Sequence, residues 1–218
     1  MRLFLFVISI LWPLNVGLAQ TVPDLGPDAE EPSVNDLETL VPDAEDKGAA
    51  VVDNDGPPES NELDDLFSSL GRAESDSIAD GIARRIQLLW LESGSDTVDL
   101  LMARAAAALK ADDLALSLDL LDVVVTLEPE FAEGWNRRAT VFYMKKDFAR
   151  SLVDIERTLA LEPRHWGALS GLAIIQRRLG QEDRALETFK QAVEIHPGLQ
   201  NARESIEALE KEAAGEPI

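Results

Sequence analysis

The feature that most constrains the fold is a repeat period of 34 residues in the second half of the chain. Pro129, Pro163 and Pro197 follow this spacing, and each comes after a helix-like apolar pattern. Four further columns keep the same register: Ala105, Ala139 and Ala173; Leu101, Trp135 and Leu169; Leu121, Ile155 and Phe189; and Leu127, Leu161 and Ile195. Such a period is typical of stacked helix pairs, because a single pair cannot bury its own apolar face. The sequence therefore predicts an all-α fold, an α-solenoid of three helix–turn–helix repeats over 98–131, 132–165 and 166–199.

The repeats resemble the tetratricopeptide repeat (TPR) family, whose pattern combines aromatic, small and apolar positions with a closing proline. The second copy carries the match as Trp135, Ala139, Phe142, Ile155 and Pro163, and the third as Leu169, Leu172, Ala173, Ala185, Phe189, Ala192 and Pro197. The first copy has Leu101, Ala105, Ser117, Leu121, Val124 and Pro129. Arg104, Arg138 and Gln176 depart from the family pattern. The resemblance implies a protein-binding scaffold whose first helices line a concave groove.

The N-terminal end of the chain has the pattern of a secretory signal peptide. Arg2 precedes an apolar run from Leu3, and small residues, Gly17 and Ala19, stand before the predicted cleavage site after residue 19. The alternative is an uncleaved anchor, but the run over 3–18 is interrupted and shorter than the roughly 20 residues of a membrane span. We therefore expect residues 1–19 to be removed, with localisation in the periplasm and no stable membrane insertion after cleavage. The chain also resembles exported repeat proteins of alphaproteobacteria.

An acidic stretch separates this leader from the repeats. Residues 20–80 hold 18 acids against Lys47 and Arg72, a net charge of −16. With its many Pro, Asp, Glu and Gly residues, the segment 20–75 is predicted to be a disordered linker. Within it, 61–71 forms a short amphipathic helix pattern with Leu63, Leu66, Phe67 and Leu70 on one stripe. The folded domain is predicted over 76–218, with an N-terminal capping helix at 76–92 and a C-terminal helix at 199–213.

Catalysis has little support in the sequence. There is no cysteine, and His165 and His196 stand one repeat apart at helix ends, so no zinc constellation is predicted. The stretch 53–56, Asp-Asn-Asp-Gly, lacks the third ligand before the glycine and the later Glu of a calcium loop. We expect no enzyme activity, no cofactor and no metal. Nucleic acid is disfavoured as a partner, because the net charge of −21 repels phosphate.

The family geometry gives candidate binding residues in the groove: Met102, Ala106, Asn136, Arg137, Thr140, Tyr143, Ile174 and Arg177. Arg137 and Tyr143 are the strongest candidates, since arginine and aromatic side chains dominate interface energetics. Segments 131–146 and 164–179 each carry a net charge of +3. A basic groove would suit an acidic partner, but lysines and arginines also favour helix C-terminal ends without any binding role.

The sequence thus favours a periplasmic scaffold that binds a peptide or acidic protein segment in its groove. The alternative is a structural subunit of a cell-envelope assembly that docks by its convex face. A further hypothesis is intramolecular: the 61–71 helix would dock in the groove, bury Phe67 and bring Asp64 and Asp65 to Arg137 or Arg177. Trp135 is expected to fill the interface between helix pairs.

Overall fold

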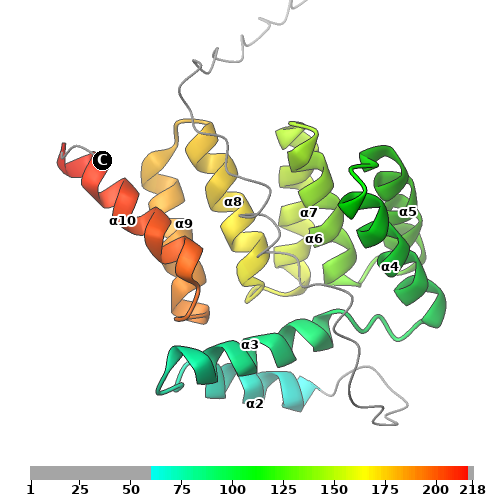
Figure 1. The fold of residues 1–218 in the computed structure, drawn as a ribbon, viewed down its shortest axis with the longest axis horizontal. Helices are drawn as coiled ribbons and strands as arrows, with labels where there is room; N and C mark the ends of the chain where they lie inside the picture. Colours follow the sequence, from blue (N-terminus) through cyan, green and yellow to red (C-terminus); the bar gives the residue numbers. More distant parts are fainter. Residues whose placement is uncertain (1–59, 216–218) are drawn as a thin grey trace, which may run out of the picture. The chain divides into compact units, whose positions relative to one another are not determined.

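The computed structural model describes residues 60–215, in which all regular secondary structure is helical (Figure 1). The predicted leader, most of the predicted linker and the 53–56 turn lie outside the described residues. The helices are α2 (Ser60–Leu70), α3 (Asp76–Trp90), α4 (Asp96–Lys110), α5 (Leu114–Leu127), α6 (Ala132–Met144), α7 (Phe148–Leu161), α8 (Trp166–Arg178), α9 (Glu182–Ile195) and α10 (Gln200–Ala214). The pairs α4–α5, α6–α7 and α8–α9 form three stacked repeats, which confirms the predicted α-solenoid.

The turns inside the three repeats share one geometry. Asp112, Lys146 and Gly180 have positive φ angles of 58°, 59° and 70°, and they stand one repeat apart. In each turn the next residue donates its backbone N–H to the carbonyl five positions earlier, at 2.9 Å. This left-handed cap satisfies carbonyls that the end of the first helix leaves open. The chain can therefore reverse within a few residues and place the two helices of a pair side by side.

Small residues allow the two helices of each pair to approach closely. Ala105, Ala139 and Ala173 are all buried. In the first two repeats a serine from the second helix donates its hydroxyl to this alanine's carbonyl: Ser117 to Ala105 at 3.1 Å and Ser151 to Ala139 at 2.8 Å. The repeated small residues thus act in packing, as the period requires.

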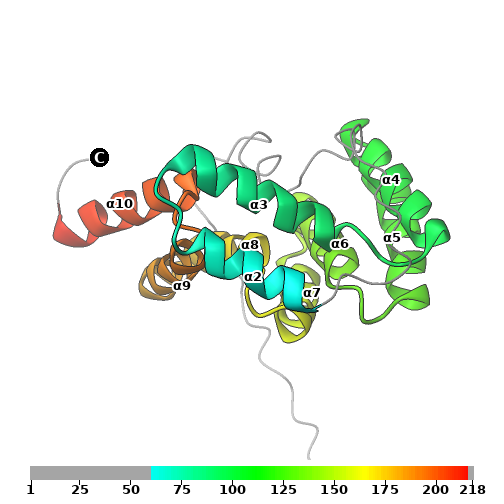
Figure 2. The ribbon, with the colours of Figure 1, turned by 90° about the horizontal axis from the view of Figure 1, so that it is seen from below.

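The pair α2–α3 does not stack on the first repeat. Its apolar residues share one cluster with Trp166, Leu169 and Ala192 of α8 and α9, whereas the core between α4 and α5 contains no residue of this pair. Figure 2, seen from below, shows both helices crossing near one end of the later repeat helices. The stripe predicted in the 61–71 segment is present in α2 and packs in this cluster. The 76–92 helix is thus formed as α3, but it covers α8 and α9 instead of capping α4.

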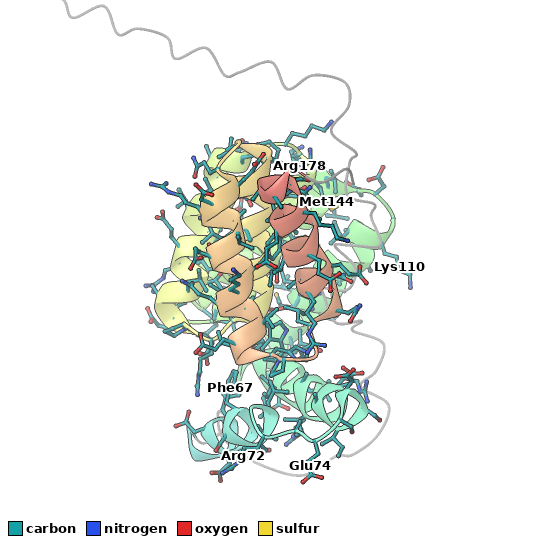
Figure 3. The ribbon with its side chains drawn as sticks, turned by 90° about the vertical axis from the view of Figure 1, so that its left-hand side faces the viewer. Phe67, Arg72, Glu74, Lys110, Met144 and Arg178 are labelled. Atoms are coloured by element: carbon teal, nitrogen blue, oxygen red, sulfur yellow. The ribbon has the colours of Figure 1, made fainter. Side chains whose placement is uncertain are left out.

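Phe67 shows how α2 is attached. Its ring centroid lies 6.0 Å from the rings of both Trp90 and Trp166, and the Arg164 guanidinium lies 4.0 Å from it. Figure 3 places Phe67 where this pair meets the repeat helices, with Arg72 and Glu74 on the outer side. Aromatic packing therefore holds an 11-residue helix that would be marginal alone in water.

The last helix, α10, covers the end of the third repeat. Ala202 and Leu209 are buried against α9, and Lys190 pairs with Glu210 at 3.0 Å. Its outer side carries Glu204 and Glu207, so the array ends on a polar surface.

Among the helices described, none combines the length and the apolar character needed to cross a membrane.

Trp135 differs from its predicted role. Its side chain is only partly buried, and its Nε1–H donates to the Pro129 carbonyl at 3.0 Å. Trp166, which is 3% exposed, is the tryptophan that fills an apolar junction.

Candidate functional site: the groove between α6 and α8

A shallow hollow lies between α6 and α8, with α7 behind it; its volume of about 360 Å³ includes the solvent on its open side. Asn136, Thr140 and Tyr143 line it from α6, and Ile174 lines it from α8. Gly167 and Gly171 form part of its wall on α8 and contribute no side chain. No charged residue lines it, so the hollow suits an apolar side chain beside a few polar groups.

Four of the eight predicted groove residues therefore come together: Asn136, Thr140, Tyr143 and Ile174. The other four lie elsewhere. Met102 is buried in the core of the first repeat, and Ala106 is half-buried on α4. Arg177 pairs with Glu212 of α10 at 2.7 Å.

Arg137 lies in a buried polar network instead of on an exposed groove surface. It is 4% exposed, and its Nε donates to Glu133 Oε1 at 2.7 Å. Glu133 Oε2 accepts from Asn136 at 3.0 Å and lies 3.0 Å from His165 Nε2. His165 Nδ1 accepts the Ala168 backbone N–H, so its Nε2 carries the hydrogen that reaches Glu133. The network joins α6 to the start of α8.

The charge of Glu133 is maintained by its neighbours. Burial opposes it, but Arg137 and the hydrogen bond from His165 hold the pKa of this carboxyl below its ordinary value of 4.5. A charged carboxylate in this position accepts three side-chain hydrogen bonds at the back of the groove. We assign it a structural role, because its partners fix the spacing of the two helices that line the hollow.

The predicted basic character of the groove is largely neutralised. Its arginines are paired with acids: Arg137 with Glu133, Arg138 with Asp122 and Asp154, Arg164 with Glu162 and Asp64, and Arg177 with Glu212. Arg178 donates to the Tyr143 hydroxyl at 2.7 Å, which fixes the ring that lines the hollow. The net charge of +3 on each segment therefore overstates the positive charge offered to a partner.

The acidic face of α2 also has a different partner from the one predicted. Asp64 pairs with Arg164 at 2.7 Å, whereas Arg137 pairs with Glu133 and Arg177 pairs with Glu212. The contact lies at the junction with Trp166, not in the hollow that Thr140 and Tyr143 line. The 61–71 segment thus folds onto the repeats outside the groove.

Sequence reasoning did not identify the aromatic stack behind this junction. Trp90 of α3 lies flat on His165, with centroids 4.2 Å apart and planes inclined by 10°. Trp90 Nε1 is buried without a hydrogen-bond partner. The sequence does show a tryptophan at the end of α3 and a histidine immediately before Trp166. The 34-residue period does not connect these two positions, so it could not predict that they meet.

Residues 60–215 contain no group of three or more His, Cys, Asp or Glu side chains that could hold a metal ion.

The stacked pairs, their shared turn geometry and the groove define an α-solenoid of the TPR type, a class of protein-interaction module. No family model matches the sequence. A TPR repeat-containing protein of Rhizobium etli, an alphaproteobacterium, is 40% identical over 153 residues, which are 70% of this chain and 75% of the relative. The chain belongs to the family of TPR repeat-containing proteins.

Solved structures support the same fold. Two crystal structures of MamA are similar to this chain with a TM-score of 0.50 each. The first is 19% identical, and the match covers 64% of this chain and 79% of the MamA chain. The second is 18% identical, and the match covers 71% of this chain and 84% of the MamA chain. At these identities the likeness concerns the fold alone.

Proposed function

We propose that this protein is a periplasmic scaffold that binds an extended peptide segment of a partner protein in the groove between α6 and α8. The observation that carries the proposal is the hollow on which Asn136, Thr140, Tyr143 and Ile174 converge. An apolar side chain of the peptide would enter it, beside the wall that Gly167 and Gly171 leave open. Membership of a family of interaction modules supports binding as the function.

The geometry favours an apolar anchor over an acidic one. An acidic segment gains most from unpaired arginines, and the groove arginines already have carboxylate partners. Tyr143 is 8% exposed and its hydroxyl is held by Arg178, so the ring contributes a fixed apolar wall. Binding would therefore depend weakly on salt.

Site-specific photo-crosslinking in cells tests this proposal. A benzophenone amino acid replaces Thr140 in the hollow or, as the control, Glu156, which is exposed on α7. We expect discrete protein adducts from position 140 only, and we expect them to be lost when Ile174→Arg fills the hollow with a charged side chain. Adducts from position 156 alone would instead support docking by the convex face.

The periplasmic location is a separate part of the proposal. It is supported by the pattern of residues 1–19, with an early cation, an apolar run and small residues before the cleavage site. N-terminal sequencing of the protein from a periplasmic extract should begin at Gln20. A protein that keeps Met1 and stays with the membrane fraction would instead support the uncleaved anchor.

A further inference from the structure

The outer surface of the first repeat carries an apolar stripe that the other repeats lack. On α5, Leu116, Val123 and Leu127 are exposed at a helical spacing of seven and four residues, and Leu120 between them is partly buried against the core of this repeat. Leu116, Val123 and Leu127 are 47%, 45% and 51% exposed, and Leu100 of α4 is 54% exposed. We call these five residues the leading edge. Single exposed leucines are common on protein surfaces and need no explanation, but several exposed apolar residues along one side of a helix form a continuous patch, which does need one.

The corresponding positions of the second repeat are mostly polar, so packing within a TPR repeat does not require apolar residues at these positions. One period after Leu116, Leu120 and Val123 stand Arg150, Asp154 and Arg157. In the third repeat the corresponding residues are Arg184, Thr188 and Gln191. The TPR packing therefore tolerates charged side chains at the positions of Leu116 and Val123, so these two apolar residues need another explanation; Leu127 belongs to the apolar column that continues as Leu161 and Ile195.

Contacts of the second repeat show what these positions face. Arg157 donates to the Pro129 carbonyl at 3.0 Å and to Glu130 at 2.7 Å, both in the loop that leaves the first repeat. At the position of Leu100, Gly134 is so close to the first repeat that an added Cβ would lie 2.8 Å from Val124 Cγ1. The positions of Leu100 and Val123 are thus those by which a repeat meets the one before it.

The first repeat has no preceding repeat at this place among the described residues. The pair α2–α3 packs with Trp166, Leu169 and Ala192, and no residue of that pair joins the cluster around α4 and α5. The positions that meet a neighbour elsewhere in the array therefore remain apolar and exposed. The opposite end differs, because α10 covers the third repeat with a polar outer side.

The charge around the leading edge identifies the occupant. Residues 96–128 contain seven acids and two bases, a net charge of −5. Asp119 is exposed on α5 next to the stripe, and Asp96, Asp112 and Asp113 are exposed at the helix ends; Asp122 already pairs with Arg138 of α6. We propose that the leading edge binds a basic amphipathic helix of a partner protein, with its apolar side on the stripe and its lysines or arginines toward these carboxylates.

Charge decides against two other occupants. A second copy of the chain would bring another region with a net charge of −5 against the first. The acidic segment over 20–80, with its net charge of −16, would be repelled more strongly. The leading edge is also separate from the groove, since the hollow is lined by α6, α7 and α8 only.

The test uses the isotope-labelled full chain and a pair of synthetic amphipathic peptides as probes. Both have leucines on one side; the first has lysines on the other side, and its twin has glutamates. We expect the lysine peptide to shift the NMR resonances of α4 and α5, and the glutamate twin to leave them in place. Raising the salt from about 50 mM to about 500 mM should weaken binding, because screening shortens the Debye length.

Two valine substitutions provide a matched comparison. Val123→Arg introduces the residue type that the second repeat carries at this position, so the fold should tolerate it. We expect it to weaken the lysine peptide by about tenfold or more. Val153→Arg makes the same change at a 61% exposed site on α7 and should leave the affinity unchanged. Leu116→Arg, which corresponds to Arg150, is a second variant if Val123→Arg disturbs folding.

Several results would overturn the inference. These are an absence of shifts at low salt, shifts confined to the groove helices, equal binding of the glutamate twin, or equal loss with Val123→Arg and Val153→Arg. Analytical ultracentrifugation adds another. A dimer that Val123→Arg dissociates and Val153→Arg does not would show that a second copy covers the leading edge.

Discussion

Removing the buried carboxylate of Glu133 should destabilise the fold far more than removing an exposed one. Glu133→Met leaves the Arg137 guanidinium, which is 4% exposed, without the carboxylate that balances its charge. It also removes the acceptor for Asn136 and His165. Breaking one side of a buried ion pair costs about 3–5 kcal/mol, and for a domain of this size that corresponds to a fall in Tm of about 10 °C.

The assay is urea and thermal unfolding of the full chain at pH 7, followed by far-UV circular dichroism. Glu156→Met is the matched control, since this glutamate is exposed on α7, and it should change stability by less than about 0.5 kcal/mol. Adding Arg137→Met to Glu133→Met should recover part of the loss, because it removes the uncompensated charge.

Two results would refute this reasoning. A cost below about 1 kcal/mol for Glu133→Met would mean that the carboxylate is solvated and the network is not buried. Strict additivity of the Glu133→Met and Arg137→Met effects would mean that the two side chains do not act as a pair. Either result would return Arg137 to its sequence-based role as an exposed groove residue.

Three further predictions concern stability. Burial lowers the pKa of His196 below its ordinary value of 6.5, so as the pH falls the unfolded chain binds a proton before the folded chain does. His196 should therefore leave Tm unchanged above pH 6.5 and lower it below pH 6.5. His196→Gln should reduce this loss of Tm. Asp112→Gly should raise the free energy of unfolding in urea by up to about 1 kcal/mol, because glycine adopts the φ of 58° without strain. Gly180→Ala should lower the free energy of unfolding by a similar amount. A change in the same direction for both variants would contradict this. Phe67→Ala should abolish hydrogen-exchange protection in α2 and leave that of α6 intact, since the ring attaches α2 at the Trp166 junction; uniform loss would show one cooperative unit.

The 34-residue period predicts the features that recur in every repeat, and few of the features that occur only once. It places the helix pairs and the groove positions of Asn136, Thr140 and Tyr143, because these depend only on register along a helix. It does not show that Arg137 turns to a buried carboxylate, since ion-pair partners depend on side-chain conformation. The exchange of roles between Trp135 and Trp166 has a similar cause: Trp166 is buried by α2 and α3, which lie outside the period.

The junction before α4 explains why the array has an uncovered edge. The second helices α5, α7 and α9 end at residues 127, 161 and 195, one period apart, whereas α3 ends at Trp90, three residues short of the corresponding position. A serine, Ser93, replaces the apolar residue of that column, and its hydroxyl donates to Asp99 at 2.7 Å; Gly94 then takes a φ of 76°. The early end leaves Trp90 free to stack on His165, far along the chain. One irregular junction therefore attaches α2–α3 beside the groove helices and leaves the leading edge exposed.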